Sequence, residues 1–174
     1  ELLENTDPLH KVTIIPRGRA LGVTMQLPEA DRHTYTKGFL ETQVAVLMGG
    51  RVAEEIFMNH MTSGASNDIE RATDIAQHMV CEWGMSELGP LAYRKPGNAF
   101  EADRPHGISE ATAQRVDDEI RRVIMSGYDR ARGVIEENRD AVRLLAEELL
   151  QVESLEADEI RAILAQAVAL KSNT

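Results

Sequence analysis

The sequence predicts a mainly α-helical fold with a small β-sheet near the N-terminus and a long helical region at the C-terminal end. Two short β-branched or alternating runs within residues 9–28, separated by a glycine-containing turn, predict the sheet. Apolar residues that recur every three or four positions from residue 33 onward predict the helices. With 174 residues, 43% of them hydrophobic, the chain is long enough for one packed domain.

The net charge limits which partners the protein can bind, and the cysteine content limits the compartment in which it is found. The net charge of -10 would repel a polyanion, so we expect no nucleic-acid partner. The single cysteine, Cys81, cannot form a disulfide within the chain, which favours a reducing compartment. No apolar run approaches the roughly 20 residues that span a bilayer. Because the sequence begins at Glu1 without a methionine, we expect it to be a fragment of a longer protein.

The N-terminal half is expected to form the sheet and two helices. The strand candidates are residues 12–15 and 21–27, with a turn at 17–20. A second helix is expected at 67–83, ending before Gly84. In the first helix, Gly49 and Gly50 predict either a break or the close approach of another backbone. That first helix, expected at 34–58, has one stripe that consists of Leu40, Val44, Leu47, Arg51, Glu54 and Met58.

The C-terminal half follows a loop that is rich in glycine and proline. A long helix is expected from an N-cap at Ser109 to about residue 138. Asp140 is expected to cap the next helix, and Ser154 or Glu156 to precede a short third one. The predicted organisation is one domain over residues 1–174. It has a core half at 1–94, a loop at 95–108 and C-terminal helices at 109–174.

The histidines do not form a metal-binding pair. No two of them are spaced i, i+4, so the sequence has no His-Glu-x-x-His helix. Taken singly, each is interpreted as a surface or loop residue. They are His10, His33, His60, His78 and His106.

The segment TSGASND at residues 62–68 runs directly into a predicted helix and has two interpretations. In one, Ser66 or Asn67 caps the helix and Asp68 is a first-turn acid favoured by the helix dipole. In the other, Asp68 faces inward, because it shares a stripe with Ala72, Ile75 and Met79. A carboxylate that faces inward requires a cation, hydrogen-bond donors or a metal. Glu54 likewise has two interpretations: it either pairs with Arg51 or holds a helix-edge position, or it orients a metal-bound imidazole as a residue of the second coordination shell.

Four segments, in this order, resemble the FtsH family of ATP-dependent zinc metallopeptidases over about residues 1–165. They are DPLHKVTIIPRGRALG at 7–22, GGRVAEEI at 49–56, TSGASND at 62–68, and WGMS with LGPL within 83–91. The resemblance implies a helical metallopeptidase domain with a zinc cofactor. It also implies that a His-Glu-Ala-Gly-His helix upstream of Glu1 supplies two zinc ligands and the general-base glutamate. No catalytic residue is then expected in the chain itself.

In this family an aspartate at the position of Asp68 is the third zinc ligand, and a glutamate at the position of Glu54 lies near the metal histidines. Three protein ligands leave a fourth position for the attacking water. The segment 21–26, with Gly22, Val23 and Thr24, is expected to bind substrate as an edge strand, because main-chain pairing accepts many sequences. Since the metal helix is missing, this fragment alone is expected to be folded but inactive.

The resemblance also implies the setting of the parent protein. This is a membrane-anchored homo-hexamer in which a separate AAA+ domain, with ATP and Mg, unfolds polypeptide substrates and passes them to the protease ring. It would degrade unfolded or damaged proteins. The expected location is the bacterial inner membrane, with this domain on the cytoplasmic side, or an equivalent organellar membrane. The alternative is a catalytically inactive helical oligomerisation module from a degenerate homologue.

Overall fold

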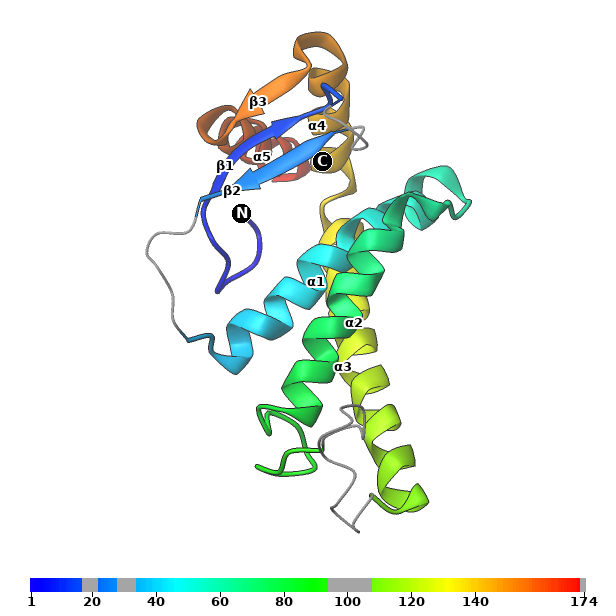
Figure 1. Ribbon diagram of the computed structural model, residues 1–174. Helices are drawn as coiled ribbons and strands as arrows, with labels where there is room; N and C mark the ends of the chain where they lie inside the picture. The colour runs from blue at the N-terminus through cyan, green and yellow to red at the C-terminus, as the bar shows by residue number, and fades with distance from the viewer. Residues whose placement is uncertain (17–21, 28–33, 94–107, 173–174) are drawn as a thin grey trace. The chain divides into compact units, whose positions relative to one another are not determined.

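The computed structural model describes residues 1–16, 22–27, 34–93 and 108–172 (Figure 1). It confirms the mainly α-helical class with a small antiparallel sheet near the N-terminus. The chain divides into two compact units. One combines Glu1–Thr34 with Gly133–Thr174, and the other is Tyr35–Arg132. The predicted turn at 17–20 and most of the predicted loop at 95–108 lie outside the described residues.

The first unit contains a three-stranded sheet in the order β2-β1-β3. Strand β1, Leu9–Thr13, pairs antiparallel with both β2, Val23–Gln26, and β3, Ser154–Glu156. The sequence analysis missed β3, although its expectation that Glu156 precedes the third helix of this region is confirmed, because the helix that follows β3 begins at Ala157. The strand conformation of β3 depends on β1, about 140 residues away, and on burial of Leu155. Ile14 and Ile15, predicted to be in the first strand, lie beyond its end and are exposed.

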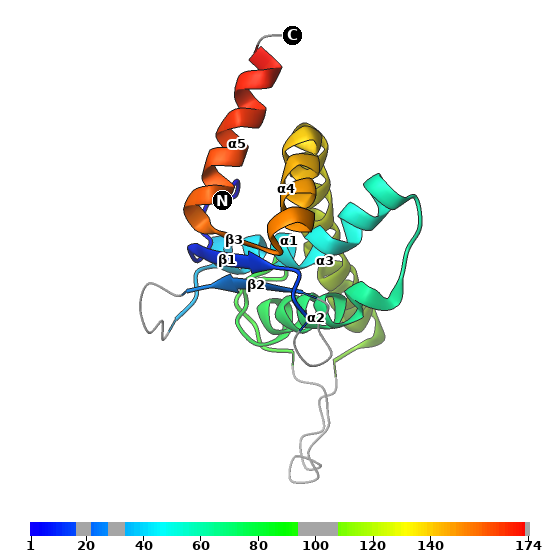
Figure 2. The same ribbon diagram turned by 90° about the horizontal axis from the view of Figure 1, so that it is seen from above.

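Two helices, α4, Arg139–Val152, and α5, Ala157–Ser172, complete this unit. They pack against each other, and α5 also contacts β1 (Figure 2). Ala141, Ile160 and Ala167 are buried. The prediction that Asp140 caps α4 was wrong, because Asp140 lies in the first turn and Asn138 holds the N-cap position. The Asn138 amide donates backward to the carbonyl of Val134 at 2.8 Å instead of capping α4.

Helix α1, Lys37–Ala53, begins the second unit. Its N-cap is Thr36, whose hydroxyl accepts a hydrogen bond from the Phe39 N–H at 3.3 Å. The predicted stripe is buried at Leu40, Val44 and Leu47. Both predictions for Gly49 and Gly50 were wrong. The helix continues through them, and a Cβ at either position would meet none of the described atoms within 4 Å.

The chain then turns back through two short helical segments. A π-helical turn, η1, covers Glu54–Met58, and a 3-10 turn, η2, covers Ser63–Ala65. Helix α2, Ser66–Cys81, packs against α1 through Ala72, Ala76, Met79 and Val80. The predicted stop at Gly84 is confirmed. Gly84 has φ +61, and a Cβ added to it would lie 2.7 Å from the Cα atom of Pro90, so this position favours glycine.

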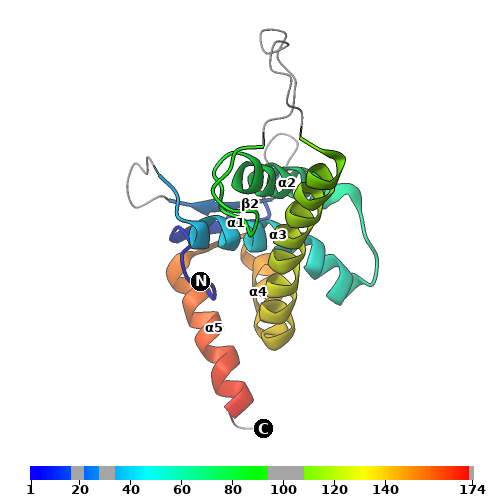
Figure 3. The same cartoon turned by 90° about the horizontal axis from the view of Figure 1, so that it is seen from below.

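Helix α3, Glu110–Glu137, begins after the predicted N-cap. The Ser109 hydroxyl accepts from the Thr112 N–H at 3.2 Å, which confirms that prediction. The helix comes closest to α1 at Gly127, and it lies beside both α1 and α2 (Figure 3). The described helices include none that is both long and apolar enough to cross a membrane.

Candidate functional site

Asp68 lies in the first turn of α2 with its side chain half-buried. Ala72 and Met79, on the same stripe, are fully buried, whereas Asp74 and His78 on the other side are exposed. This confirms that Asp68 is in line with the core-facing side of its helix. Within the described residues its carboxylate makes no hydrogen bond or ion pair. This half-buried acid thus has lone pairs available for a cation.

The segment that leads into α2 is capped by a residue that the sequence analysis missed. The predicted caps were wrong, because the N-cap position is Ala65 and no side chain bonds to the helix start there. Instead, the Thr62 hydroxyl accepts a hydrogen bond from the Gly64 N–H at 3.0 Å and caps η2. The available signal was a threonine two residues before a glycine, which is typical of a side chain–backbone turn.

Glu54 holds this segment to the end of α1. One carboxylate oxygen accepts from the Thr62 N–H at 3.1 Å, and the other accepts from the Thr62 hydroxyl. The side-chain bond from Thr62, followed by the backbone bond, lowers the pKa of Glu54 below its ordinary value. The expected ion pair with Arg51 is not formed, since Arg51 Nε bonds to Glu55 at 3.0 Å. The prediction that Glu54 supports a metal-bound imidazole stays a prediction.

The residues present fit one position of a zinc site. A half-buried carboxylate that has no bonding partner in the described part of the chain is a suitable oxygen ligand. Further ligands are not gathered around it, because no three His, Cys, Asp or Glu side chains cluster among the described residues. His10, His60 and His78 are exposed, as expected. His33 and His106 lie outside the described residues.

The predicted substrate segment forms one of the two edge strands of the sheet in the first unit. Gly22 precedes β2 and approaches β1 so closely that a Cβ would lie 2.8 Å from the Thr13 carbonyl oxygen. The Leu27 N–H donates to the Pro8 carbonyl at 3.1 Å, so the backbone of residue 27 faces β1. Because backbone direction alternates along a strand, Val23 also faces β1 and Thr24 faces away. Leu21, predicted as part of this segment, lies outside the described residues.

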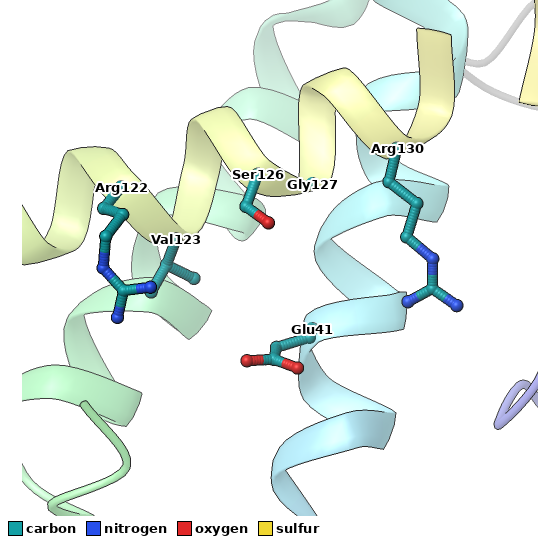
Figure 4. A pocket seen from close by; sticks show the side chains of 6 residues that line it. All are labelled: Glu41, Arg122, Val123, Ser126, Gly127 and Arg130. Atoms are coloured by element: carbon teal, nitrogen blue, oxygen red, sulfur yellow. The ribbon is translucent and has the colours of Figure 1, made fainter. Parts of the chain in front are cut away.

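A hollow lies between α1 and α3 in the second unit (Figure 4). Its two arginines are engaged elsewhere, since Arg122 makes two bonds to Glu119 and Arg130 donates to the Thr42 hydroxyl at 2.9 Å. We therefore assign no ligand to it. Its lining residues are Glu41, Arg122, Val123, Ser126, Gly127 and Arg130.

Comparison with known proteins agrees with the resemblance of the four sequence segments to the FtsH family. The model of peptidase family M41 matches residues 1–163. The chain is 52% identical over 165 residues, 92% of its length, to the ATP-dependent zinc metalloprotease FtsH of Acidobacterium capsulatum, of which it covers 26%. It is 46% identical to that of Magnetococcus marinus, covering 94% of the chain and 25% of the relative. It is 49% identical to the ATP-dependent zinc metalloprotease FtsH 2 of Methylacidiphilum infernorum, and this match covers 93% of the chain and 26% of the relative.

The chain thus spans about a quarter of the length of these curated relatives. The match of the family model, in contrast, extends over nearly the whole chain. The chain therefore belongs to peptidase family M41.

Proposed function

We propose that this chain is the larger part of the peptidase domain of an ATP-dependent zinc endopeptidase. The observation that carries the proposal is Asp68. It is a half-buried carboxylate in line with the core face of α2, without a bonding partner in the described part of the chain, in a segment that resembles the FtsH zinc-ligand block. When bound, zinc supplies a Lewis acid for hydrolysis of a peptide bond.

In this proposal each described element has a separate task. Asp68 supplies one oxygen ligand, and two histidines and the general-base glutamate come from a helix upstream of Glu1. Glu54 fixes the segment before α2 by accepting both hydrogen bonds from Thr62. Strand β2, with Gly22, Val23 and Thr24, pairs with an extended polypeptide through its outward-facing main chain. Because main-chain pairing reads few side chains, this mode suits unfolded substrates of many sequences.

The relatives' names indicate ATP-dependent zinc metalloproteases, and the remaining features of the whole protein are proposed from the resemblance of the four sequence segments to the FtsH family. We propose a membrane-anchored homo-hexamer, with ATP and Mg in a separate AAA+ domain, that degrades unfolded or damaged polypeptides. Its place would be the bacterial inner membrane, with the peptidase domain on the cytoplasmic side, or an organellar equivalent. We expect the 174-residue chain alone to hold no catalytic zinc and to cleave no peptide, because in this proposal two of the zinc ligands and the general base lie upstream of Glu1.

The test compares Asp68→Asn with Asp74→Asn in the full-length protein. Both changes remove one negative charge from α2, but Asp74 lies on the exposed side. We expect Asp68→Asn to lose bound zinc and casein hydrolysis while its helicity and ATPase activity remain. The control Asp74→Asn should keep its zinc content, casein hydrolysis, helicity and ATPase activity. Full zinc content and activity in Asp68→Asn would reject the ligand role. A full-length wild-type protein without zinc or protease activity would support the inactive oligomerisation module.

A further inference from the structure

Glu55, the neighbour of Glu54 in the π-helical turn, is the centre of a polar cluster that ties this turn to α1 and α3. Its Oε2 atom accepts from Arg132 Nη2 at 2.6 Å and from the Tyr128 hydroxyl, and Arg132 Nη2 also donates to that hydroxyl. Its Oε1 atom accepts from Arg51 Nε at 3.0 Å. The Arg132 guanidinium lies 5.2 Å from the Tyr128 ring centre. Both carboxylate oxygens of Glu55 are thus held by charged donors.

These contacts are better shielded from water than an ordinary surface ion pair. The side chains of Glu55 and Arg51 are 23% exposed, and that of Arg132 is 35% exposed. Two arginines and a phenol on one carboxylate form a network in which each bond restrains the geometry of the others. Exposed single pairs, in contrast, contribute little. The cluster therefore restrains the rotation of η1 about its axis.

That rotation decides where the Glu54 carboxylate points. Neighbouring residues are about 100° apart around an α-helix and slightly less around a wider π-helical turn. With Glu55 held by α1 and α3, Glu54 is left to face the returning chain at Thr62. Thr62 in turn caps η2, which continues directly into α2 and Asp68. A continuous series of hydrogen bonds and short helical segments therefore joins Arg132 to the start of α2.

We propose that the cluster of Glu55, Tyr128, Arg132 and Arg51 positions Asp68 for metal binding by acting through Glu54 and Thr62. This inference rests on the proposed zinc-ligand role of Asp68. The four residues are positioning residues, since among the described residues no hydrogen bond or ion pair joins any of them to Asp68. A simpler alternative is that the cluster only fastens α3 to the end of α1. In that case its loss lowers stability and leaves the metal site unchanged.

The test uses the full-length protein and three variants, Glu55→Gln, Arg132→Met and Arg132→Lys. We expect the first two to weaken zinc binding about 10-fold in competition with a chelator, as is typical of residues that support metal ligands from outside. Arg132→Lys restores a cation and is expected to recover part of this loss. Arg122→Met is the matched control. It breaks an ion pair with Glu119 on the same helix without touching Glu55, so zinc affinity should match wild type.

A second measurement does not depend on zinc or activity. In the metal-free protein, amide hydrogen exchange of residues 62–68 should become faster in Glu55→Gln and Arg132→Met, but not in Arg122→Met. Unchanged exchange and wild-type zinc affinity in both variants, with a lower Tm alone, would overturn the inference in favour of the fastening role. If Glu55→Gln does not fold, Tyr128→Phe, which removes one hydroxyl, takes its place with the same two measurements.

Failure of this inference is distinguishable from failure of the proposed function. If Asp68→Asn loses zinc while the cluster variants retain wild-type affinity and exchange, only the positioning role is rejected. If Asp68→Asn binds zinc like wild type, the ligand role itself is rejected. The exchange measurement then still reports whether the cluster orders residues 62–68, because it is made without metal.

Discussion

Gly127 of α3 lies so close to Val44 of α1 that a Cβ on the glycine would stand 2.6 Å from Cγ1 of the valine. The same Cβ would lie 3.1 Å from the backbone nitrogen of Ala45. Val44 is fully buried and cannot move aside without disturbing the core of this unit. The absent side chain at Gly127 therefore sets how closely the two helices pack.

Gly127→Ala should destabilise the protein by about 1–3 kcal/mol, because an added methyl group overfills a tight contact. Gly133→Ala is the control in the same helix, since a Cβ there would meet no described atom within 4 Å. That change should instead stabilise by roughly 0.5–1 kcal/mol, the usual helix preference for alanine. Urea denaturation measures both. Equal effects of the two changes would mean that the close approach at Gly127 has no energetic consequence.

The Glu54–Thr62 contact should appear in the acid titration. The two Thr62 bonds hold the pKa of Glu54 below its ordinary value of 4.5. Since the pKa is lower in the folded state, the contact stabilises fully above about pH 4.5, and this stabilisation is lost as the pH falls through the lowered pKa. Thr62→Val removes the hydroxyl and keeps the N–H, so the pKa of Glu54 should rise. Carboxyl-carbon NMR measures it. Thr62→Ser retains the hydroxyl and should keep the low pKa.

Glu153, after the end of α4, should be a site where glycine stabilises the protein. It has φ 63, a left-handed conformation that costs a residue with a Cβ about 1–2 kcal/mol. Its carbonyl accepts from the Ile14 N–H and the Thr13 hydroxyl, both at 3.0 Å, so the conformation is required for the link between α4 and the sheet. Because glycine also gives the unfolded chain more freedom, we expect a net gain of about 0.5–1 kcal/mol for Glu153→Gly. Thermal unfolding should show no gain for Glu153→Ala.

Proline substitutions in β2 should separate substrate pairing from sheet formation. The Thr24 N–H faces away from β1, so Thr24→Pro removes a donor that only an added strand could use. The Val23 N–H faces β1, so Val23→Pro breaks the sheet itself. In the full-length protein we expect Thr24→Pro to lose casein cleavage with Tm and ATPase activity retained. Val23→Pro should lower Tm as well. Normal cleavage by a folded Thr24→Pro protein would exclude β2 as the substrate strand.

Local features of the sequence were sufficient for several elements. The spacing of Leu40, Val44 and Leu47 predicted the buried face of α1, and Ser109 predicted the start of α3. Periodicity also put Asp68 on the core-facing stripe of α2. These predictions succeeded because amphipathic helices and side-chain caps depend on residues a few positions apart. The four family segments depend only on residue order, and the match to peptidase family M41 agrees with them.

Only the tertiary structure decided which side chains meet. The three residues Ser154–Glu156 form a strand because β1 lies beside them, and no local pattern reports a partner so far away. Arg51 pairs with Glu55 and not Glu54, because the π-helical turn directs two neighbouring glutamates to different partners. Tyr128 and Arg132 reach Glu55 across 73 and 77 residues. Sequence periodicity gives the face on which a residue lies, whereas the identity of its partner depends on how distant helices pack.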